Sequence, residues 1–280
     1  MLAFITGASS GIGRDMAKVL AHKGYDLIIT ARDEEKLFEL RNEILNESRA
    51  IKNKKDETKE QYSNLQINIK IITANLENEN EVFGLYEKIK NENIDLFINN
   101  AGFGNIGNFW DTDLETEINM IKVNDIAMHI LFKLVLRDMI KNINETAKEI
   151  NEKYILNVSS LSGYMPGPKM ATYYSTKAYM LNLTKAVYKE LKMEKQKVNI
   201  SVLCPGPIYT NFADRAGVKF KTIHLTSEYT AKYAISKLFE KKLVIIPGFI
   251  NKCGHVLSKL IPSKIVMAVT YRIQDKKVDK

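Results

Sequence analysis

The stretch Leu2-Ala3-Phe4-Ile5-Thr6-Gly7-Ala8-Ser9-Ser10-Gly11-Ile12-Gly13 places a glycine-rich turn between a short apolar run and a helical pattern. Strand, glycine turn and helix in this order are the layout of a dinucleotide-binding site. We expect Gly7 to turn the chain sharply off the strand, Gly11 to let N–H groups approach a pyrophosphate, and Gly13 to let the helix pack closely. The spacing departs from the usual Gly-x-Gly-x-x-Gly, so the interpretation depends on the flanking strand and helix.

The rest of the chain alternates between strand and helix patterns with no linker between them. The predicted strands are residues 2–5, 25–30, 67–73, 94–98, 153–159, 198–204 and 243–246. Two predicted helices begin near Ile12 and Val82. The other predicted helices cover residues 34–48, 114–142, 171–194 and 227–240. Residues 207–225 are loop-like, and we expect no chemistry from the polar stretch 52–63. Such alternation predicts a single α/β domain with a doubly wound parallel sheet.

Composition fits a soluble protein of ordinary type. The chain has 280 residues, a net charge of +8 and 45% hydrophobic residues. Its lysines are scattered, which indicates a solvated basic surface; a cofactor phosphate, an acyl carrier or a lipid headgroup are the alternative anionic partners. We expect no nucleic acid partner.

Two distant cysteines, Cys204 and Cys253, and four scattered histidines give no disulfide framework and no metal site. This usage fits a reducing compartment, and we expect a cytoplasmic protein. The N-terminus shows no signal peptide, and no apolar run reaches the roughly 18 residues that span a bilayer.

A second stretch, residues 172–179, contains Tyr173 and Lys177. On a helix, residues four apart lie on one face. An ammonium beside a phenol favours the phenolate and lowers its pKa from about 10. The pair is therefore a candidate general acid/base unit. A solvated helix face is the alternative for the pair taken alone.

Two loops at predicted strand ends point to the ligand. Asn99-Asn100-Ala101-Gly102 ends the fourth strand, where ligands bind in open α/β sheets. Ala31-Arg32 ends the second strand, where an acidic residue would accept from a free ribose hydroxyl. Arg32 instead suits a 2′-phosphate, so we expect NADP(H); an ordinary surface arginine is the alternative.

Together these motifs resemble the short-chain dehydrogenases/reductases over about residues 2–247. They occur in that family's order and spacing, and the chain is most similar to bacterial oxidoreductases labelled 3-oxoacyl reductase-like or uncharacterised. The resemblance implies a Rossmann-like doubly wound parallel sheet of about seven strands with helices on both faces. It also implies a homo-oligomer, dimer or tetramer. The motifs that carry it are residues 6–13 and 99–102, Asn124, Ser160, Tyr173-x-x-x-Lys177, and Pro205-Gly206 with Thr210.

The resemblance implies a catalytic group of Asn124, Ser160, Tyr173 and Lys177. Tyr173 gives its proton to the substrate oxygen as hydride arrives at carbon. Lys177 lowers the phenol pKa and holds the nicotinamide ribose. Ser160 positions the carbonyl, and Asn124 holds a water that links Lys177 to solvent.

Ser159 and Ser162 flank Ser160, which is selected because the family's serine lies thirteen positions before its tyrosine. Tyr174 is the alternative to Tyr173, but it lies three rather than four residues from Lys177.

The resemblance also implies the residues that hold the cofactor. Asn75 departs from the family's usual Asp, but its side-chain oxygen still accepts a bond from the adenine amino group. The expected cofactor-binding residues are Gly7, Ser9, Ser10, Gly11, Ile12, Gly13, Arg32, Asn75, Leu76, Asn100, Ala101, Gly102, Tyr173, Lys177, Pro205, Gly206, Ile208 and Thr210.

The function expected is hydride transfer between NADP(H) and a small-molecule carbonyl or secondary alcohol. Residues 103–110, 161–170 and 207–225 and the tail are expected to set specificity. An apolar or acyl-type substrate is suggested by Phe103, Phe109, Trp110, Met165 and Phe212; ordinary core packing of these residues is the alternative. A non-catalytic dinucleotide-sensing or scaffold protein on the same fold is the alternative; it would be expected to lack Tyr or Lys at the site.

The tail is expected to be separate from the catalytic domain, residues 1–247. In residues 248–280, apolar positions from Cys253 to Ile261 form a one-faced helix pattern that Pro262 ends. We expect an amphipathic helical extension packed on the domain. Covering the pocket, pairing subunits and weak peripheral contact with a membrane are its open roles.

Overall fold

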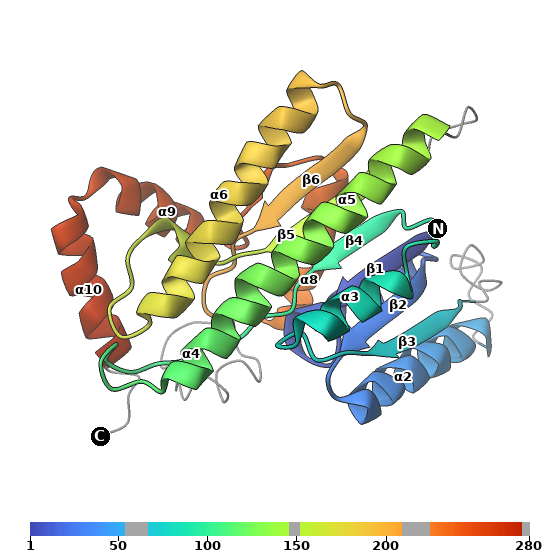
Figure 1. Ribbon diagram of the computed structural model, residues 1–280, viewed down its shortest axis with the longest axis horizontal. Helices are drawn as coiled ribbons and strands as arrows, with labels where there is room; N and C mark the ends of the chain where they lie inside the picture. Colours follow the sequence, from blue (N-terminus) through green and yellow to red (C-terminus); the bar gives the residue numbers. More distant parts are fainter. Residues whose placement is uncertain (54–66, 146–151, 209–224, 276–280) are drawn as a thin grey trace.

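A computed structural model describes residues 1–53, 67–145, 152–208 and 225–275, and the side chains of all these except 49–53, 258 and 259 (Figure 1). Thr210, Phe212 and most of the polar stretch 52–63 lie outside the described residues.

The described residues form a seven-stranded, wholly parallel sheet with the order β3-β2-β1-β4-β5-β6-β7. The direction of the strand order reverses between β1 and β4. This is the switch point at which open α/β sheets bind ligands. The strands are β1 (Leu2–Thr6), β2 (Asp26–Ala31), β3 (Ile69–Thr73), β4 (Leu96–Asn99), β5 (Lys153–Val158), β6 (Val198–Leu203) and β7 (Val244–Ile245).

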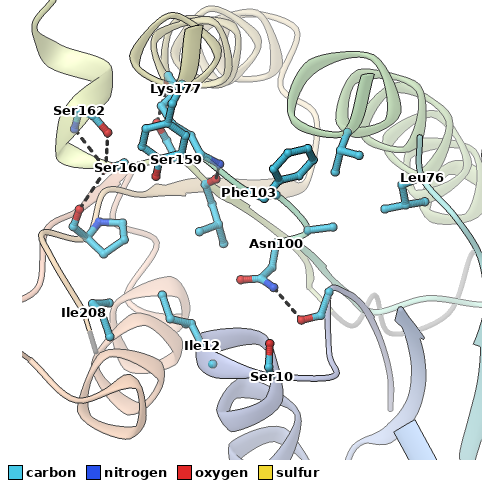
Figure 2. A pocket seen from close by; sticks show the side chains of 18 of the residues that line it. Ser10, Ile12, Leu76, Asn100, Phe103, Ser159, Ser160, Ser162, Lys177 and Ile208 are labelled. Carbon is cyan, nitrogen blue, oxygen red and sulfur yellow. Dashed lines mark hydrogen bonds between the residues drawn. The ribbon is translucent and has the colours of Figure 1, made fainter. Parts of the chain in front are cut away.

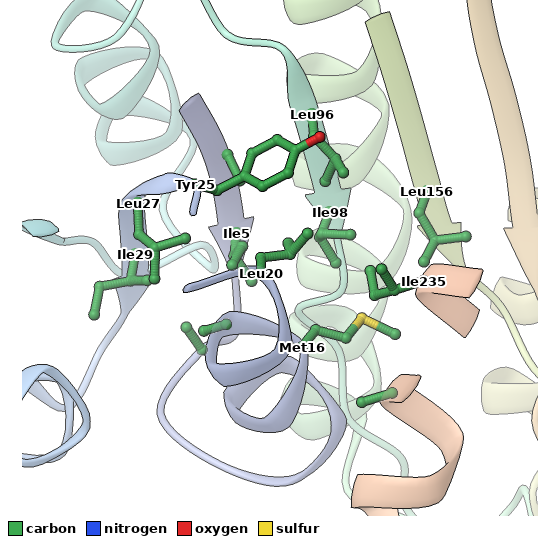
Figure 3. Close-up of a cluster of buried hydrophobic side chains, with 14 of the residues drawn as sticks. Ile5, Met16, Leu20, Tyr25, Leu27, Ile29, Leu96, Ile98, Leu156 and Ile235 are labelled. Atoms are coloured by element: carbon green, nitrogen blue, oxygen red, sulfur yellow. The ribbon is translucent and has the colours of Figure 1, made fainter. Parts of the chain in front are cut away.

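Helices cover both faces of the sheet, because alternate residues of each central strand point to opposite sides. Ile5 packs with α1, α2 and α8, while its neighbour Phe4 packs with α3, α5 and α6. Figure 3 shows Met16 and Leu20 of α1 against the strand residues on the face of the sheet to which Ile5 points. These helices are α1 (Gly11–His22), α2 (Glu34–Asn53), α3 (Glu79–Glu87), α5 (Met128–Glu145), α6 (Ala171–Met193) and α8 (Ser227–Phe239).

The helix predicted over 114–142 is interrupted. It consists of α4 (Leu114–Ile121), a π-helical turn η2 (Lys122–Ala127) and α5. The side chains of Asn124 and Val123 are buried at this turn. Hydrophobic periodicity does not reveal a π turn, since one extra residue leaves the apolar pattern on both sides intact. The 3₁₀ turn η3 (Leu161–Tyr164) was likewise not predicted.

The C-terminal part consists of two helices, α9 (Phe249–Leu260) and α10 (Ser263–Asp275), of which the sequence pattern predicted only the first. The break falls at Pro262, as expected. α10 lies beside the segment that leads into α6 (Figure 1), and Gln274 donates a hydrogen bond to the Tyr174 hydroxyl at 2.7 Å. The last described turn of the tail therefore lies close to α6.

Candidate active site

A cavity of about 380 Å³ lies at the carboxyl ends of the central strands. The glycine turn forms one side of it and the start of α6 the other (Figure 2). Of the residues expected at the site, those that line it are Gly7, Ser9, Ser10, Gly11, Ile12, Arg32, Leu76, Asn100, Ala101, Gly102, Ser160, Tyr173, Lys177, Pro205, Gly206 and Ile208.

The glycine turn is shaped for close approach of the backbone to a ligand. Gly7 and Gly11 have φ of 66° and 55°, a region that favours glycine. A Cβ on Gly7 would lie 2.8 Å from the Ala101 Cα. Ser10 precedes α1 without a side-chain cap, and no acidic residue occupies the first helical turn. The first N–H groups of α1 therefore remain available to an anion.

Asn100 ties the turn to β4. Its Nδ2 donates to the main-chain oxygens of Thr6 (3.0 Å) and Gly7 (3.1 Å). Gly13 does not line the cavity: a Cβ there would lie 2.4 Å from both the Gly7 oxygen and the Asn100 Nδ2. Gly13 has the packing role expected, although its close neighbours are the turn and Asn100.

At the opposite side, three hydroxyls meet. The Ser162 Oγ donates to the Ser160 Oγ at 2.6 Å, and both serines hydrogen-bond the Tyr173 phenol. The Ser160 Oγ also lies 3.4 Å from the Pro205 main-chain oxygen, to which it donates. The structure thus places Ser160 beside Tyr173, as the thirteen-residue spacing indicated.

The pKa of Tyr173 corrects one expectation. Burial is the largest influence and raises it to about 12; the bonds from Ser160 and Ser162 oppose that rise. Lys177 was expected to bring this pKa below its ordinary value. Its Nζ lies 5.8 Å from the Tyr173 ring centre, and the burial of the phenol outweighs any such effect.

Lys177 is buried and donates to the Val158 main-chain oxygen at 3.1 Å. Burial lowers the pKa of Lys177 to about 8, and the carboxylate of Asp125 partly opposes this. Burial raises the pKa of Asp125 to about 7. Its Oδ1 is buried without a hydrogen-bond partner among the described residues.

Asn124 does not line the cavity but fixes one of its walls. Its side chain accepts from the Phe103 N–H at 3.0 Å and donates to the Phe103 oxygen at 2.8 Å. It also donates to the Thr176 Oγ1 at 3.1 Å. A Cβ on Gly102 would lie 2.9 Å from the Asn124 Oδ1 and 3.2 Å from the Lys177 Nζ. Asn124 therefore clamps the loop after β4 beside Lys177.

The far end of the cavity, after β2, carries charges of both signs. Arg32 lines it and pairs with Glu77; Lys36 and Asp33 also line it and pair with each other at 2.9 Å. Asn75 is not among the described lining residues. Its Oδ1 accepts from the Glu77 N–H at 3.2 Å, so the Asn75 side chain bonds within the turn after β3.

The loop after β6 closes the cavity next to the tail. A Cβ on Gly206 would lie 2.5 Å from the Asn251 Oδ1 of α9. Ile208 is buried and bridges to Leu225. The remaining expected residue of this loop, Thr210, cannot be placed because it lies outside the described residues.

The suggested apolar pocket is only partly formed by the residues expected. Phe103 lines the cavity, whereas Phe109 and Trp110 are 66% and 81% exposed. Met165 is not among the described lining residues. The cavity is also lined by Leu161, Met170, Tyr174, Pro207 and Gln274.

Fold and cavity together define an open α/β protein with a cavity at the carboxyl ends of its strands, the place where such sheets bind ligands. The family model described as short chain dehydrogenase matches residues 1–62 and 49–219. The chain belongs to the short-chain dehydrogenase family, which confirms the resemblance.

Curated relatives agree with this assignment. An uncharacterised oxidoreductase of Staphylococcus saprophyticus is 28% identical over 75% of this chain and 79% of its own length. A very-long-chain 3-oxoacyl-CoA reductase of Yarrowia lipolytica is 28% identical over 71% of this chain. The match spans about half, 49%, of the yeast protein.

Solved structures with about one-fifth identity show the same fold. A Sphingobium yanoikuyae short-chain dehydrogenase in complex with NADPH has a TM-score of 0.73 at 23% identity, over 93% of this chain and 96% of that one. A Burkholderia phymatum short-chain dehydrogenase/reductase in complex with NAD has a TM-score of 0.76 at 20% identity, over 92% of both chains. Structural neighbours thus bind nicotinamide dinucleotides of both kinds.

The sequence analysis missed three side chains at or beside the site, and it named Ser162 only as a neighbour of Ser160. Lys36 could have been recognised from its place four residues after Arg32. Asp125 follows Asn124, but its burial depends on the π turn. No local pattern points to Gln274, since a tail helix brings it to a helix 100 residues away.

The described residues form neither a metal-binding cluster nor a membrane-spanning helix. In the part of the chain that the structure describes, no three or more His, Cys, Asp or Glu side chains gather as a metal site requires. None of the helices traced there has both the length and the apolar content needed to span a bilayer.

Proposed function

We propose that the protein is an NADP(H)-dependent oxidoreductase that interconverts a carbonyl and a secondary alcohol. The observation that carries this proposal is that one cavity holds the glycine turn at one side and Ser160, Tyr173 and Lys177 at the other. A nicotinamide dinucleotide supplies or accepts the hydride when bound. The protein then has to bind that group, orient the carbonyl and move one proton.

Tyr173 is the proposed acid in the reductive direction. Its pKa of about 12 keeps the phenol protonated at neutral pH, so the proton is in place before reaction. Donation leaves a phenolate, which the ammonium of Lys177 stabilises. The hydroxyls of Ser160 and Ser162, which already bond the phenol, are placed to hold the substrate oxygen beside it.

Proton replacement is assigned to Lys177 and Asn124. Both Nδ2 hydrogens of Asn124 have acceptors, so a water beside Lys177 would bond to its Oδ1, which accepts only from Phe103 among the described groups and retains a lone pair. Asn124 also holds Phe103 at the cavity wall. The proposal therefore gives Asn124 both a positioning role and the water contact.

The residues present fit a dinucleotide. The uncapped start of α1 and the left-handed Gly7 and Gly11 provide an anion cradle that side chains would obstruct. We place the adenine end after β2 and β3, near Arg32 and Leu76, with Asn75 as an adenine contact only after its present bond to Glu77 is released. Pro205, Gly206, Ile208 and Thr210 are the proposed contacts at the nicotinamide end.

Preference for NADP(H) is proposed from two cations. Arg32 and Lys36 line the end of the cavity where a 2′-phosphate would lie. Each has an acidic partner, Glu77 and Asp33 respectively, so binding exchanges those pairs for the phosphate.

The substrate is proposed to be an apolar or acyl-type carbonyl compound. Phe103, Leu161 and Met170 give the wall near Tyr173 an apolar character. Curated relatives include reductases named for 3-oxoacyl-CoA. A panel of ketones, acyl thioesters and steroids, with NADPH and NADH oxidation as readout, tests the proposal. Turnover of at least one class supports it.

The alternative is a non-catalytic dinucleotide sensor on the same fold. It predicts tight dinucleotide binding, no turnover of any panel member, and an altered thermal transition on binding. The intact Ser160-Tyr173-Lys177 group favours the enzyme, because a sensor has no need of a buried acid beside an ammonium.

The arrangement of the whole protein belongs to the same proposal: a catalytic domain of residues 1–247, an extension of residues 248–280, a dimer or tetramer, and a cytoplasmic location. Light scattering after size-exclusion chromatography measures the subunit number.

We also propose weak contact of the extension with an anionic membrane surface. Its exposed apolar side chains are Phe249, Ile250, Val256, Leu257, Leu260, Ile265, Val269, Tyr271 and Ile273. Four cations and a single acidic residue, Asp275, lie in residues 249–275. Flotation with anionic vesicles at low and high salt tests the contact, with Ile250→Glu as the matched variant. Absence from vesicles at low salt would refute it.

A further inference from the structure

The helix α10 buries polar side chains and exposes apolar ones. It buries Thr270 and Gln274, which are four residues apart and polar, while Ile265, Val269 and Ile273 are exposed. Burying a polar side chain costs free energy unless it is hydrogen-bonded. Thr270 meets this cost within the helix, because its Oγ1 donates to the Val266 main-chain oxygen at 2.5 Å. Only one of the two polar atoms of the Gln274 side chain is hydrogen-bonded.

Gln274 is 3% exposed and lines the cavity. Its Nε2 donates to the Tyr174 hydroxyl at 2.7 Å, whereas its Oε1 has no partner among the described residues. A buried amide oxygen left unpaired costs about 1–3 kcal/mol. The Tyr174 hydroxyl accepts from Gln274, so its own proton is available for donation. The pair thus retains the Gln274 Oε1 as an acceptor, and the Tyr174 hydroxyl proton and the second Nε2 hydrogen as donors.

The surroundings hold this pair in place. The Tyr174 ring lies against the backbone of Gly167, where a Cβ would come within 2.2 Å of it. Lys169, in the same loop, pairs with Asp275 at 2.7 Å and so anchors the last turn of α10. Lys169 itself has φ of 66°, a conformation that costs energy outside glycine.

Tyr174 also connects the pair to the reacting group. Its ring centre lies 6.2 Å from that of Tyr173, and the rings meet edge to face. Both tyrosines and Gln274 line the same cavity. A molecule whose carbonyl lies at Tyr173 can therefore reach the Gln274–Tyr174 pair with its remaining atoms.

We infer that Gln274 and Tyr174 form a polar subsite that selects carbonyl substrates bearing a second, neutral group that both donates and accepts a hydrogen bond, a hydroxyl or an amide. The group donates to the Gln274 Oε1 and accepts from the Tyr174 hydroxyl. A hydrocarbon in its place leaves both protein groups unpaired, and sites of this kind discriminate strongly against analogues that lack the polar group. The inference deepens the proposed function and rests on it for the carbonyl only.

The test uses a straight-chain methyl ketone and its monohydroxy derivatives, with the hydroxyl moved one carbon at a time. Dissociation constants are measured by calorimetry and kcat and KM by NADPH oxidation. One hydroxy ketone is expected to bind about tenfold or more tightly than the parent ketone, since a tenfold change corresponds to about 1.4 kcal/mol. The gain should appear mainly in KM, because the group does not react.

Three variants locate the effect. Gln274→Met and Tyr174→Phe keep the volume and remove the polar atoms, and each is expected to reduce the preference for the hydroxy ketone over the parent ketone to about twofold or less. Thr270→Val, on the same buried face but outside the cavity, is expected to retain the full preference. Circular dichroism verifies that each variant is folded.

The outcomes separate the two proposals. Selective binding of a hydroxy ketone without turnover of any ketone would contradict the proposed function and support the subsite. Turnover of all ketones with no selectivity at any hydroxyl position would overturn the subsite alone. Selectivity that persists in Gln274→Met, or failure of every compound to bind, would also overturn it.

Discussion

The ammonium group of Lys177 donates to the main-chain oxygen of Val158, 3.1 Å away at the carboxyl end of β5. This bond fixes a buried cation beside the cavity, 5.8 Å from the ring centre of Tyr173. Burial makes the charge costly and lowers the pKa of Lys177 to about 8. A group with this pKa loses its charge just above neutral pH, within the range of an ordinary assay.

The rate of carbonyl reduction is therefore expected to fall above about pH 8. Tyr173, with a pKa of about 12, keeps its proton throughout the range, so the falling limb reports Lys177. Once the ammonium is neutral, the phenolate formed by proton donation has no adjacent cation, and kcat/KM decreases with pH. A pH profile of kcat/KM measures this. A rate that stays constant to about pH 10 would disagree with the assignment.

Replacing Asp125 should shift the falling limb of the kcat/KM pH profile. Its carboxylate raises the pKa of Lys177, so Asp125→Asn is expected to move the limb to lower pH by up to about one unit. The same variant should be more stable than the wild type at pH 8, because the raised pKa of Asp125 makes its ionised form unfavourable in the fold above about pH 7. The stability gain should shrink as the pH falls, which thermal unfolding at several pH values can show. If the falling limb does not move in Asp125→Asn, Asp125 does not influence the pKa of Lys177.

Charge reversal at Arg32 tests the cofactor preference. Arg32→Asp is expected to weaken NADPH binding by about tenfold or more and to affect NADH little, because charged hydrogen bonds contribute about 1.5–3 kcal/mol. Glu77→Gln is the matched variant: it releases Arg32 from its ion pair and should keep or tighten NADPH binding. Paired fluorescence titrations measure both. Equal NADPH affinity in Arg32→Asp and wild type would remove Arg32 from the argument.

Close packing at the glycine turn predicts a stability difference between two glycines. Gly13→Ala brings a Cβ to 2.4 Å from the Gly7 oxygen and should destabilise the fold by about 1–3 kcal/mol. Gly84→Ala in α3 meets nothing within 4 Å and should be neutral or stabilising by up to about 1 kcal/mol. Urea unfolding compares the two. Equal effects would mean that the contact at Gly13 is easily relieved.

Much of the fold could be predicted because its signals are local. Alternating residues such as Phe4 and Ile5 define two buried faces, and Gly7 and Gly11 define the turn that begins α1. The seven-stranded parallel sheet with helices on both faces is confirmed. The strand ends differ by one or two residues, as at Ile69, because burial continues beyond the last ladder bond.

The site was predictable only where spacing along one helix or one loop determines proximity. Tyr173 and Lys177 belong to a single helix, and Ser160 follows a central strand. The direction of the Tyr173 pKa was predicted wrongly, since burial is a property of the assembled fold. Gln274 and Asp125 depend on a tail helix and a π turn, and neither leaves a local pattern in the sequence.

The central claim is that Tyr173 supplies the proton during hydride transfer. Tyr173→Phe keeps the ring and removes only the hydroxyl, so dinucleotide binding should stay within about twofold of wild type. With a working ketone from the substrate panel, kcat for NADPH-dependent reduction should fall by about 10²–10⁴-fold, the usual contribution of a positioned acid. Full turnover in folded Tyr173→Phe protein would contradict the account.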